Sequence, residues 1–230
     1  MSHRQPDSLA AKLNWLRAGV LGANDGVVST AGIVMGVAGA TDNSNALLVA
    51  GLAGLVAGAL SMAGGEYVSV SSQKDTEIAA VRQVRSQLTD HPEQSLDELT
   101  ESYQRRGLSP DLAKQVATAL SQNDAIAAQT EARFGISAHE HTSPWAAALA
   151  SLLSFTIGAA IPLVAMVSTS VHWRIPATIV AVILALLLTG SVAAWLGHAR
   201  VGRAMLRNCL VGAMTMAVTY GVGHLLHVQL

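Results

Sequence analysis

Five long apolar stretches constrain this chain more than any other feature of its sequence. Each is long enough to cross a bilayer as a helix, which takes roughly 20 apolar residues. They lie at residues 18–40, 46–70, 145–171, 175–199 and 208–230. Charged residues make up only 13% of the chain, whereas a typical soluble domain has about 25%. The sequence therefore predicts an all-α membrane protein with five transmembrane helices.

A polar segment separates the second apolar stretch from the third. Residues 73–142 hold eleven of the fifteen acidic residues and seven of the fourteen basic ones. Apolar residues recur there at helical spacing, and Ser95 with Glu98 has the spacing of a helix-capping box. We expect three parts: an N-terminal tail with transmembrane helices 1–2 (1–72), a helical cytoplasmic domain of metal-binding type (73–142), and transmembrane helices 3–5 (143–230). The first cytoplasmic helix has no visible break from the second transmembrane helix.

The basic residues predict the orientation. With five spans, thirteen of the fourteen Lys and Arg residues fall on one side of the membrane, and only Arg174 falls on the other. Basic residues favour the cytoplasmic side, so we expect the N-terminus and residues 73–142 in the cytoplasm and the C-terminus outside. The first stretch, ending in "AGA" at 38–40, also resembles a signal peptide, but it is too long and contains Asp25. Five spans suit a bacterial inner membrane or a eukaryotic vacuole, and the compact chain favours the bacterial inner (cell) membrane.

Several classes of function are disfavoured by composition. The formal net charge is −1, so nothing indicates a nucleic-acid partner. A single cysteine, Cys209, excludes an intrachain disulfide and a cysteine-based zinc site. The chain has no Walker A lysine motif, no GxSxG and no HExxH. We therefore expect a protein that is not an enzyme and that holds no permanent cofactor.

Asp25 is the first candidate site residue, inside the apolar run "LGANDGVVSTAGIVMGVAGA". A charged side chain at the bilayer centre costs about 2.5–3.5 kcal/mol on insertion scales, so such residues are usually functional. The alternative is that Asp25 lies near the interface, where the cost is small. Asn24 and Gly26 flank it and favour a helix break, whose free carbonyls could coordinate a cation beside the carboxylate.

Met62 and Glu66 form the second candidate, in "SMAGGEYVSV". They are four residues apart, so they share one helix face. A thioether and a carboxylate together suit a soft-to-borderline cation such as Fe²⁺ rather than Mg²⁺. The alternative is that Met62 only packs and Glu66 pairs with a cation at the interface. A short connection makes the first two spans antiparallel neighbours, with Asp25 and this pair at similar depth.

Other patterns carry weaker predictions. The glycine pairs Gly22–Gly26, Gly32–Gly36 and Gly54–Gly58 each have small-xxx-small spacing, which lets helices approach closely, within one chain or between two. His139 with His141, and His224 with His227, could each bind a metal, although interfacial histidine is the simpler interpretation. Met214 and Met216 in the last span are interpreted as packing residues.

Four segments together resemble the vacuolar iron transporter family, which includes bacterial members. They are "LGANDGVVSTAGIVMGV", "AGLVAGALSMAGGEYVSVSSQKDTE", "SFTIGAAIPL" and "RNCLVGAMTMAVTYGVGHLL". The resemblance implies a homodimer that moves Fe²⁺, and often Mn²⁺, out of the cytoplasm in exchange for protons. It also implies that Asp25, Met62 and Glu66 line a pathway at the dimer interface, with Asn24 beside them.

The cytoplasmic segment departs from the family pattern. Metal-binding members carry several glutamates on the helix that continues from the second span, and a Glu/Met set on the last cytoplasmic helix. Here the continuing helix has only Glu77, and the last helix has no methionine. The remaining candidates for a weak cytoplasmic metal site are Glu77, Asp97, Glu98, Glu101 and Glu131; otherwise this segment serves dimerisation.

Two other functions compete with a metal/proton exchanger. One is a non-transporting membrane scaffold or metal sensor whose cytoplasmic helices bind a partner, for which Asp25 would be dispensable. The other is a transporter of an organic cation with Asp25 as counter-ion. Aromatic residues would help to cage such a cation, and the spans hold few of them.

Overall fold

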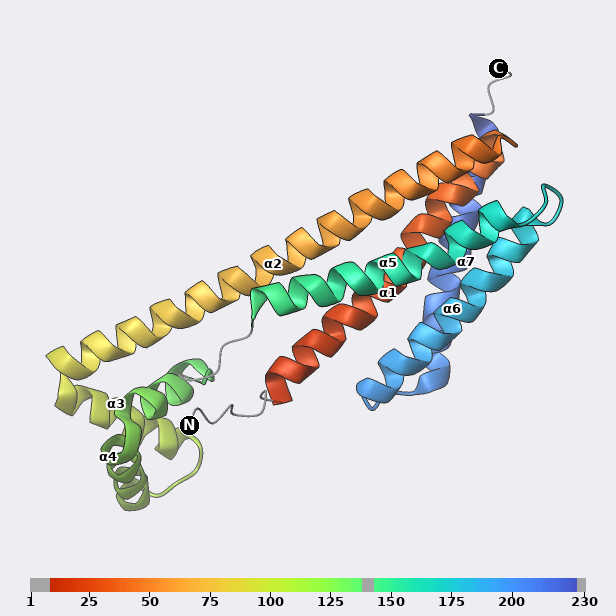
Figure 1. Ribbon diagram of the computed structural model, residues 1–230. Coiled ribbons are helices and arrows are strands. Elements are labelled where there is room, and N and C mark those ends of the chain that lie inside the picture. The colour runs from red at the N-terminus through yellow and green to blue at the C-terminus, as the bar shows by residue number, and fades with distance from the viewer. Residues whose placement is uncertain (1–8, 138–142, 227–230) are drawn as a thin grey trace, which may run out of the picture. The chain divides into compact units, whose positions relative to one another are not determined.

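The computed structural model describes residues 9–137 and 143–226, and all regular elements in these ranges are α-helices. The helices are α1 (Leu9–Ala40), α2 (Ser44–Asp90), α3 (Pro92–Arg105), α4 (Pro110–Phe134), α5 (Pro144–Ser168), α6 (Arg174–Leu196) and α7 (Val201–Leu225) (Figure 1). The chain divides into two compact units. Unit 1 comprises Met1–Val68 and Ser143–Leu230, and unit 2 comprises Ser69–Thr142. The prediction of an all-α fold is confirmed.

Local sequence explains one helix start and one helix end. Asn43 caps α2, because its Oδ1 accepts from the backbone N–H groups of Asn45 and Ala46 at 2.9 and 3.2 Å. Gly135 ends α4 with φ of 67°, a left-handed conformation that glycine adopts without strain. α2 continues for 47 residues without interruption, as expected from the sequence.

The predicted cap at Ser95 is wrong. α3 begins at Pro92, with His91 in the capping position. Ser95 is buried in the first turns of α3, and its hydroxyl donates to the backbone carbonyls of His91 and Gln87. Proline at the first helical turn fixes the backbone for helix entry, which explains why the helix starts three residues before Ser95.

α1 forms the centre of unit 1 and packs against α5, α6 and α7 (Figure 1). Its contact with α5 depends on glycine. A Cβ at Gly26 would collide with the backbone carbonyl of Phe155, and a Cβ at Gly158 would collide with that of Ala23. The small-residue spacing of Gly22 and Gly26 therefore brings α1 against a helix of the same chain.

The outward faces of unit 1 are strongly apolar. On α5, Ile157 is 67% exposed, and on α6, Leu188 is 66% exposed. Within the described residues, four helices are long and apolar enough to span a membrane: α1, the first part of α2, α5 and α6. α7, which carries Arg203 and Arg207, is not among them. Continuous apolar faces of this extent are stable in lipid rather than in water, so unit 1 is membrane-embedded.

Arg174 joins α6 to the connection between α1 and α2. Its side chain is buried, with only 3% of its surface exposed. The guanidinium donates to the backbone carbonyl of Asp42 at 3.1 Å and to the Ser44 hydroxyl at 3.3 Å. Arg174 therefore holds the α1–α2 hairpin, which carries the candidate site residues, against the start of α6.

We expect Arg174→Lys to destabilise unit 1. An ammonium lacks the planar fork that reaches both oxygens, and each lost hydrogen bond to a charged group costs about 1.5–3 kcal/mol. Differential scanning fluorimetry of the purified protein should show a lower unfolding temperature. Arg200→Lys, at an exposed position, is the matched control and should leave the midpoint unchanged. An equal midpoint for both variants would contradict the role of Arg174.

Candidate metal pathway

An open groove runs between α1 and α2 in unit 1, with a volume of about 560 Å³. Asp25, Ser29 and Ile33 line it from α1 at intervals of four residues, so one face of α1 supplies all three. The lining residues from the other helices are Gly54, Ala57, Gly58, Ser61, Met62, Gly65 and Glu66 of α2 and Phe155 of α5. The structure thus brings Asp25, Met62 and Glu66 to one groove.

The two carboxylates in this groove are not neutralised by the described part of the chain. The ion pairs formed by the described side chains involve Arg105 with Glu101 and Arg133 with Glu98, all in unit 2. Asp25 is exposed to the groove, and Glu66 is half-buried. Two carboxylates on facing helices in a membrane-embedded unit favour binding of a cation that enters the groove.

Met62 and Tyr67, the residue after Glu66, contact aromatic side chains of α5. Met62 packs on the cluster of Ala59, Phe155 and Ala159. The Tyr67 ring lies against the Trp145 ring at an interplanar angle of 53°, with ring centroids 4.8 Å apart. Gly54 and Gly58 let the side chains of Ile33 and Phe155 approach the backbone of α2, whereas a Cβ at Gly65 would meet nothing within 4 Å. Met62 lines the same groove as the two carboxylates.

Asn24 lies on a different face of α1 from Asp25, because successive helical residues are turned by about 100°. Its side-chain oxygen accepts from Nδ2 of Asn208 at 3.0 Å and from the Thr189 hydroxyl at 3.4 Å. Asn24 is thus bonded to α6 and α7 and does not line the groove. These bonds fix the rotation of α1 that presents Asp25 to α2.

The predicted break in the first transmembrane helix is wrong. α1 is helical from Leu9 to Ala40, through Asn24, Asp25 and Gly26. The carbonyl of Asp25 also accepts from the Ser29 hydroxyl at 2.6 Å. Gly26 serves the close approach of α5 instead of a turn, so the groove offers side-chain ligands rather than free backbone carbonyls.

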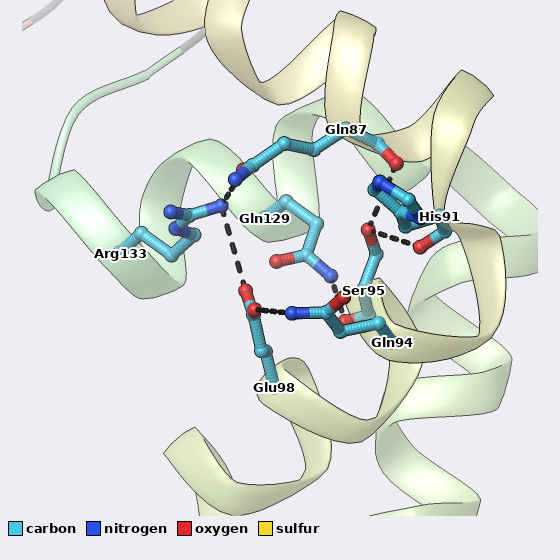
Figure 2. A network of polar contacts seen from close by, with 7 residues as sticks. All are labelled: Gln87, His91, Gln94, Ser95, Glu98, Gln129 and Arg133. Carbon is cyan, nitrogen blue, oxygen red and sulfur yellow. Dashed lines mark hydrogen bonds and ion pairs between the residues drawn. The ribbon is translucent and has the colours of Figure 1, made fainter.

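Unit 2 contains a polar network that joins the end of α2 to α3 and α4 (Figure 2). The Arg133 guanidinium donates to the side chain of Gln87 and lies 3.5 Å from the Glu98 carboxylate. Gln94 donates to the same carboxylate at 3.1 Å. Gln129, fully buried, donates to the backbone carbonyl of Ser95. Glu98 is therefore already occupied by protein donors.

The five acidic residues considered for a cytoplasmic metal site do not converge. Glu98 pairs with Arg133, Glu101 lies 3.6 Å from Arg105, and Glu77 accepts from Gln73 at 2.9 Å. Asp97 and Glu131 are exposed. Across residues 9–137 and 143–226, no three His, Cys, Asp or Glu side chains are grouped to hold a metal. The assignment of these residues as metal ligands stays a prediction.

The histidine pairs add no site within the described residues. His139 and His141 lie outside the described ranges, as does His227. His224 stacks on Tyr220 with ring centroids 6.4 Å apart. Met216 is buried in the core of unit 1, which agrees with its interpretation as a packing residue, whereas Met214 is 63% exposed.

Sequence reasoning missed three polar partners. Asn208 and Thr189 support Asn24, and Arg133 neutralises Glu98. Asn208 is an amide at the start of an apolar stretch, a signal that could have been noticed. The pairing of Arg133 with Glu98 joins positions 35 residues apart and has no local signal in the sequence.

Comparison with known proteins places the chain in a family. The model of the VIT family matches residues 16–224. A "Vacuolar iron transporter" of Acanthamoeba castellanii is 42% identical over 92% of this chain and 78% of its own length. "Vacuolar iron transporter homolog 5" of Oryza sativa subsp. japonica is 36% identical over 93% of this chain and 81% of its own length. "Vacuolar iron transporter homolog 1" of Arabidopsis thaliana is 34% identical over 98% of this chain and 90% of its own length.

These similarities cover both units and include the segments that carry Asp25, Met62 and Glu66. The resemblance seen in the sequence is confirmed, and the apolar helices together with the relatives identify an integral membrane protein. The chain belongs to the VIT family of vacuolar iron transporters.

Proposed function

We propose that this protein moves Fe²⁺, with Mn²⁺ as a second cargo, out of the cytoplasm in exchange for protons. The observation that carries the proposal is the α1–α2 groove, where Asp25, Glu66 and the Met62 thioether line one space in a membrane-embedded unit. Carboxylate oxygens with a thioether sulfur suit a borderline divalent cation better than a hard one. The names of the relatives support iron as the cargo.

Proton exchange follows from the chemistry of these ligands. A carboxylate must lose its proton to bind a metal ion, so metal binding releases protons and proton binding releases the metal. Asp25 and Glu66 would bind the metal ion while the groove is open to one side of the membrane and protons while it is open to the other. The metal ion and the protons would then cross the membrane in opposite directions. No described cation competes for these carboxylates by forming an ion pair.

The orientation and assembly belong to the same proposal. The excess of Lys and Arg puts the N-terminus and residues 73–142 on the cytoplasmic side and the C-terminus outside, with α7 as the fifth span. The expected membrane is the bacterial inner membrane. The groove is open, and α2 exposes Val56 and Leu60 at 52% and 61%. A second copy of the chain packed on this face would enclose the groove, and the pathway would then lie at the interface of a homodimer.

The test is metal entry into sealed liposomes that contain the purified protein. Entry of Fe²⁺ and Mn²⁺ well above that in protein-free vesicles, with little entry of Mg²⁺, is the expected result. The same vesicles with a trapped pH dye report the opposing proton flux. Vesicles that admit none of these metals would contradict the transport function and favour a scaffold or sensor.

We expect Met62→Leu to change the metal preference. Leucine keeps the side-chain volume but removes the sulfur, which favours Fe²⁺ more than the harder Mn²⁺. The ratio of Fe²⁺ to Mn²⁺ flux should therefore fall several-fold. Met214→Leu, the same change at an exposed position of α7 outside the groove, should keep the wild-type ratio. Equal ratios in both variants would exclude Met62 as a ligand.

A further inference from the structure

A second groove lies in unit 1, between the first part of α1 and the end of α6. It has a volume of about 390 Å³, and its lining is almost entirely apolar. The lining residues are Leu16, Arg17, Val20 and Leu21 of α1, Ala193 and Leu196 of α6, and Gly197 directly after α6. Gly197 is the C-cap residue of α6 and adds no side chain to the groove.

Arg17 is the one charged residue among those that line this groove. Its side chain is exposed, and no described carboxylate lies within ion-pair distance of it. Residues 143–230, which supply the other wall, contain no Asp or Glu at all. The groove therefore combines an apolar channel with one cation that forms no ion pair among the described residues.

The position of the groove along the membrane is marked by tryptophan. Trp195, two residues before Gly197, is 74% exposed. Exposed tryptophans gather at the level of the lipid headgroups. Beyond Gly197, the chain continues to Arg200 and Arg203, which are also exposed. Arg17 thus lies near headgroup depth, and Val20, Leu21 and Ala193 lie on the acyl-chain side.

We infer that this groove binds one anionic phospholipid, with its phosphate at Arg17 and an acyl chain along Val20, Leu21, Ala193 and Leu196. Grooves between transmembrane helices that carry basic residues at the interface recognise anionic headgroups. A free phosphate would gain nothing from the apolar lining, and a neutral lipid would gain nothing from Arg17. The site lies between α1 and α6, apart from the α1–α2 groove, so it does not depend on metal transport.

Native mass spectrometry of the full-length protein tests this site. The probes are phosphatidylglycerol and phosphatidylcholine with identical acyl chains, added in equal amounts to the protein in detergent. One cation near an anionic group contributes about 1 kcal/mol, so the wild type should retain phosphatidylglycerol with a preference of about fivefold. Arg17→Gln should bind the two lipids equally. Arg85→Gln makes the same charge change at an exposed position of α2 outside the groove and should keep the preference.

A second variant separates the groove from general surface charge. Ala193→Trp fills the apolar channel and keeps Arg17, so the bound phosphatidylglycerol should also be lost. Glycerol 3-phosphate, which has the anion without the chains, should not displace the lipid. The inference is overturned if Arg17→Gln keeps the wild-type preference, if Arg17→Gln and Arg85→Gln lose it equally, or if glycerol 3-phosphate competes.

Discussion

Asp25→Asn is expected to abolish metal transport while the protein still folds. Asparagine has nearly the same shape, but it cannot carry the negative charge that binds a divalent cation or the proton that is exchanged for it. Asp25 lines the α1–α2 groove and its side chain forms no described ion pair that the change would break. Removal of a carboxylate from the membrane-embedded unit also avoids its burial cost. Fe²⁺ entry into liposomes should fall to the level of protein-free vesicles.

The control for this variant is Asp42→Asn. Asp42 lies in the α1–α2 connection, and its side chain is exposed. The bond from Arg174 goes to the backbone carbonyl of Asp42, so the exchange of the side chain leaves that bond in place. Asp42→Asn should transport at the wild-type rate. Wild-type transport by Asp25→Asn would contradict the proposed role of Asp25 in metal binding.

Gly158→Ala is expected to destabilise unit 1 strongly. The added Cβ would collide with the backbone carbonyl of Ala23, which cannot move aside as a side chain could. The change must therefore push α5 away from α1, and overpacking of this kind costs about 1–3 kcal/mol. For a chain of this size each kcal/mol lowers the unfolding midpoint by roughly 2–4 °C. Transport should fall as well, because Ala23 is next to Asn24 and Asp25.

Gly202→Ala provides the matched comparison. It makes the same change on α7, where a Cβ would meet nothing within 4 Å. Alanine is a better helix former than glycine, so this variant should be as stable as the wild type or slightly more so. Scanning fluorimetry of the two purified variants distinguishes packing at Gly158 from a general effect of alanine. Equal midpoints would contradict the close α1–α5 contact.

The helices were largely predictable from the sequence because lipid imposes long apolar segments. α5 and α6 begin and end within a few residues of the expected stretches, and α1 ends where expected but begins nine residues earlier, at Leu9. α7 begins at Val201, before the apolar stretch expected at 208–230. Its first turns contain Arg203 and Arg207, so they were not part of the apolar stretch. Ser95 shows the limit of local capping signals, since Pro92 starts the helix earlier and tertiary contacts bury the serine.

The groove was predictable in part. The spacing of Met62 and Glu66 placed them on one face, and the short connection placed Asp25 on the neighbouring helix. The hydrogen bonds of the Asn24 side chain could not be predicted from neighbouring residues, because its partners Asn208 and Thr189 are more than 160 residues away in the sequence. The helix break expected at Gly26 was wrong because a glycine in a membrane helix serves either a turn or close packing. Only the position of α5 distinguishes these two roles.

The central claim is that a proton gradient drives the metal through the α1–α2 groove. The most direct measurement is Fe²⁺ accumulation in liposomes whose interior is made acidic, with the protein oriented so that residues 73–142 face outward. The account predicts that Fe²⁺ accumulates above its outside concentration, that the interior becomes more alkaline, and that a protonophore abolishes both. Fe²⁺ that only equilibrates across the membrane, at a rate independent of the pH gradient, would contradict proton exchange.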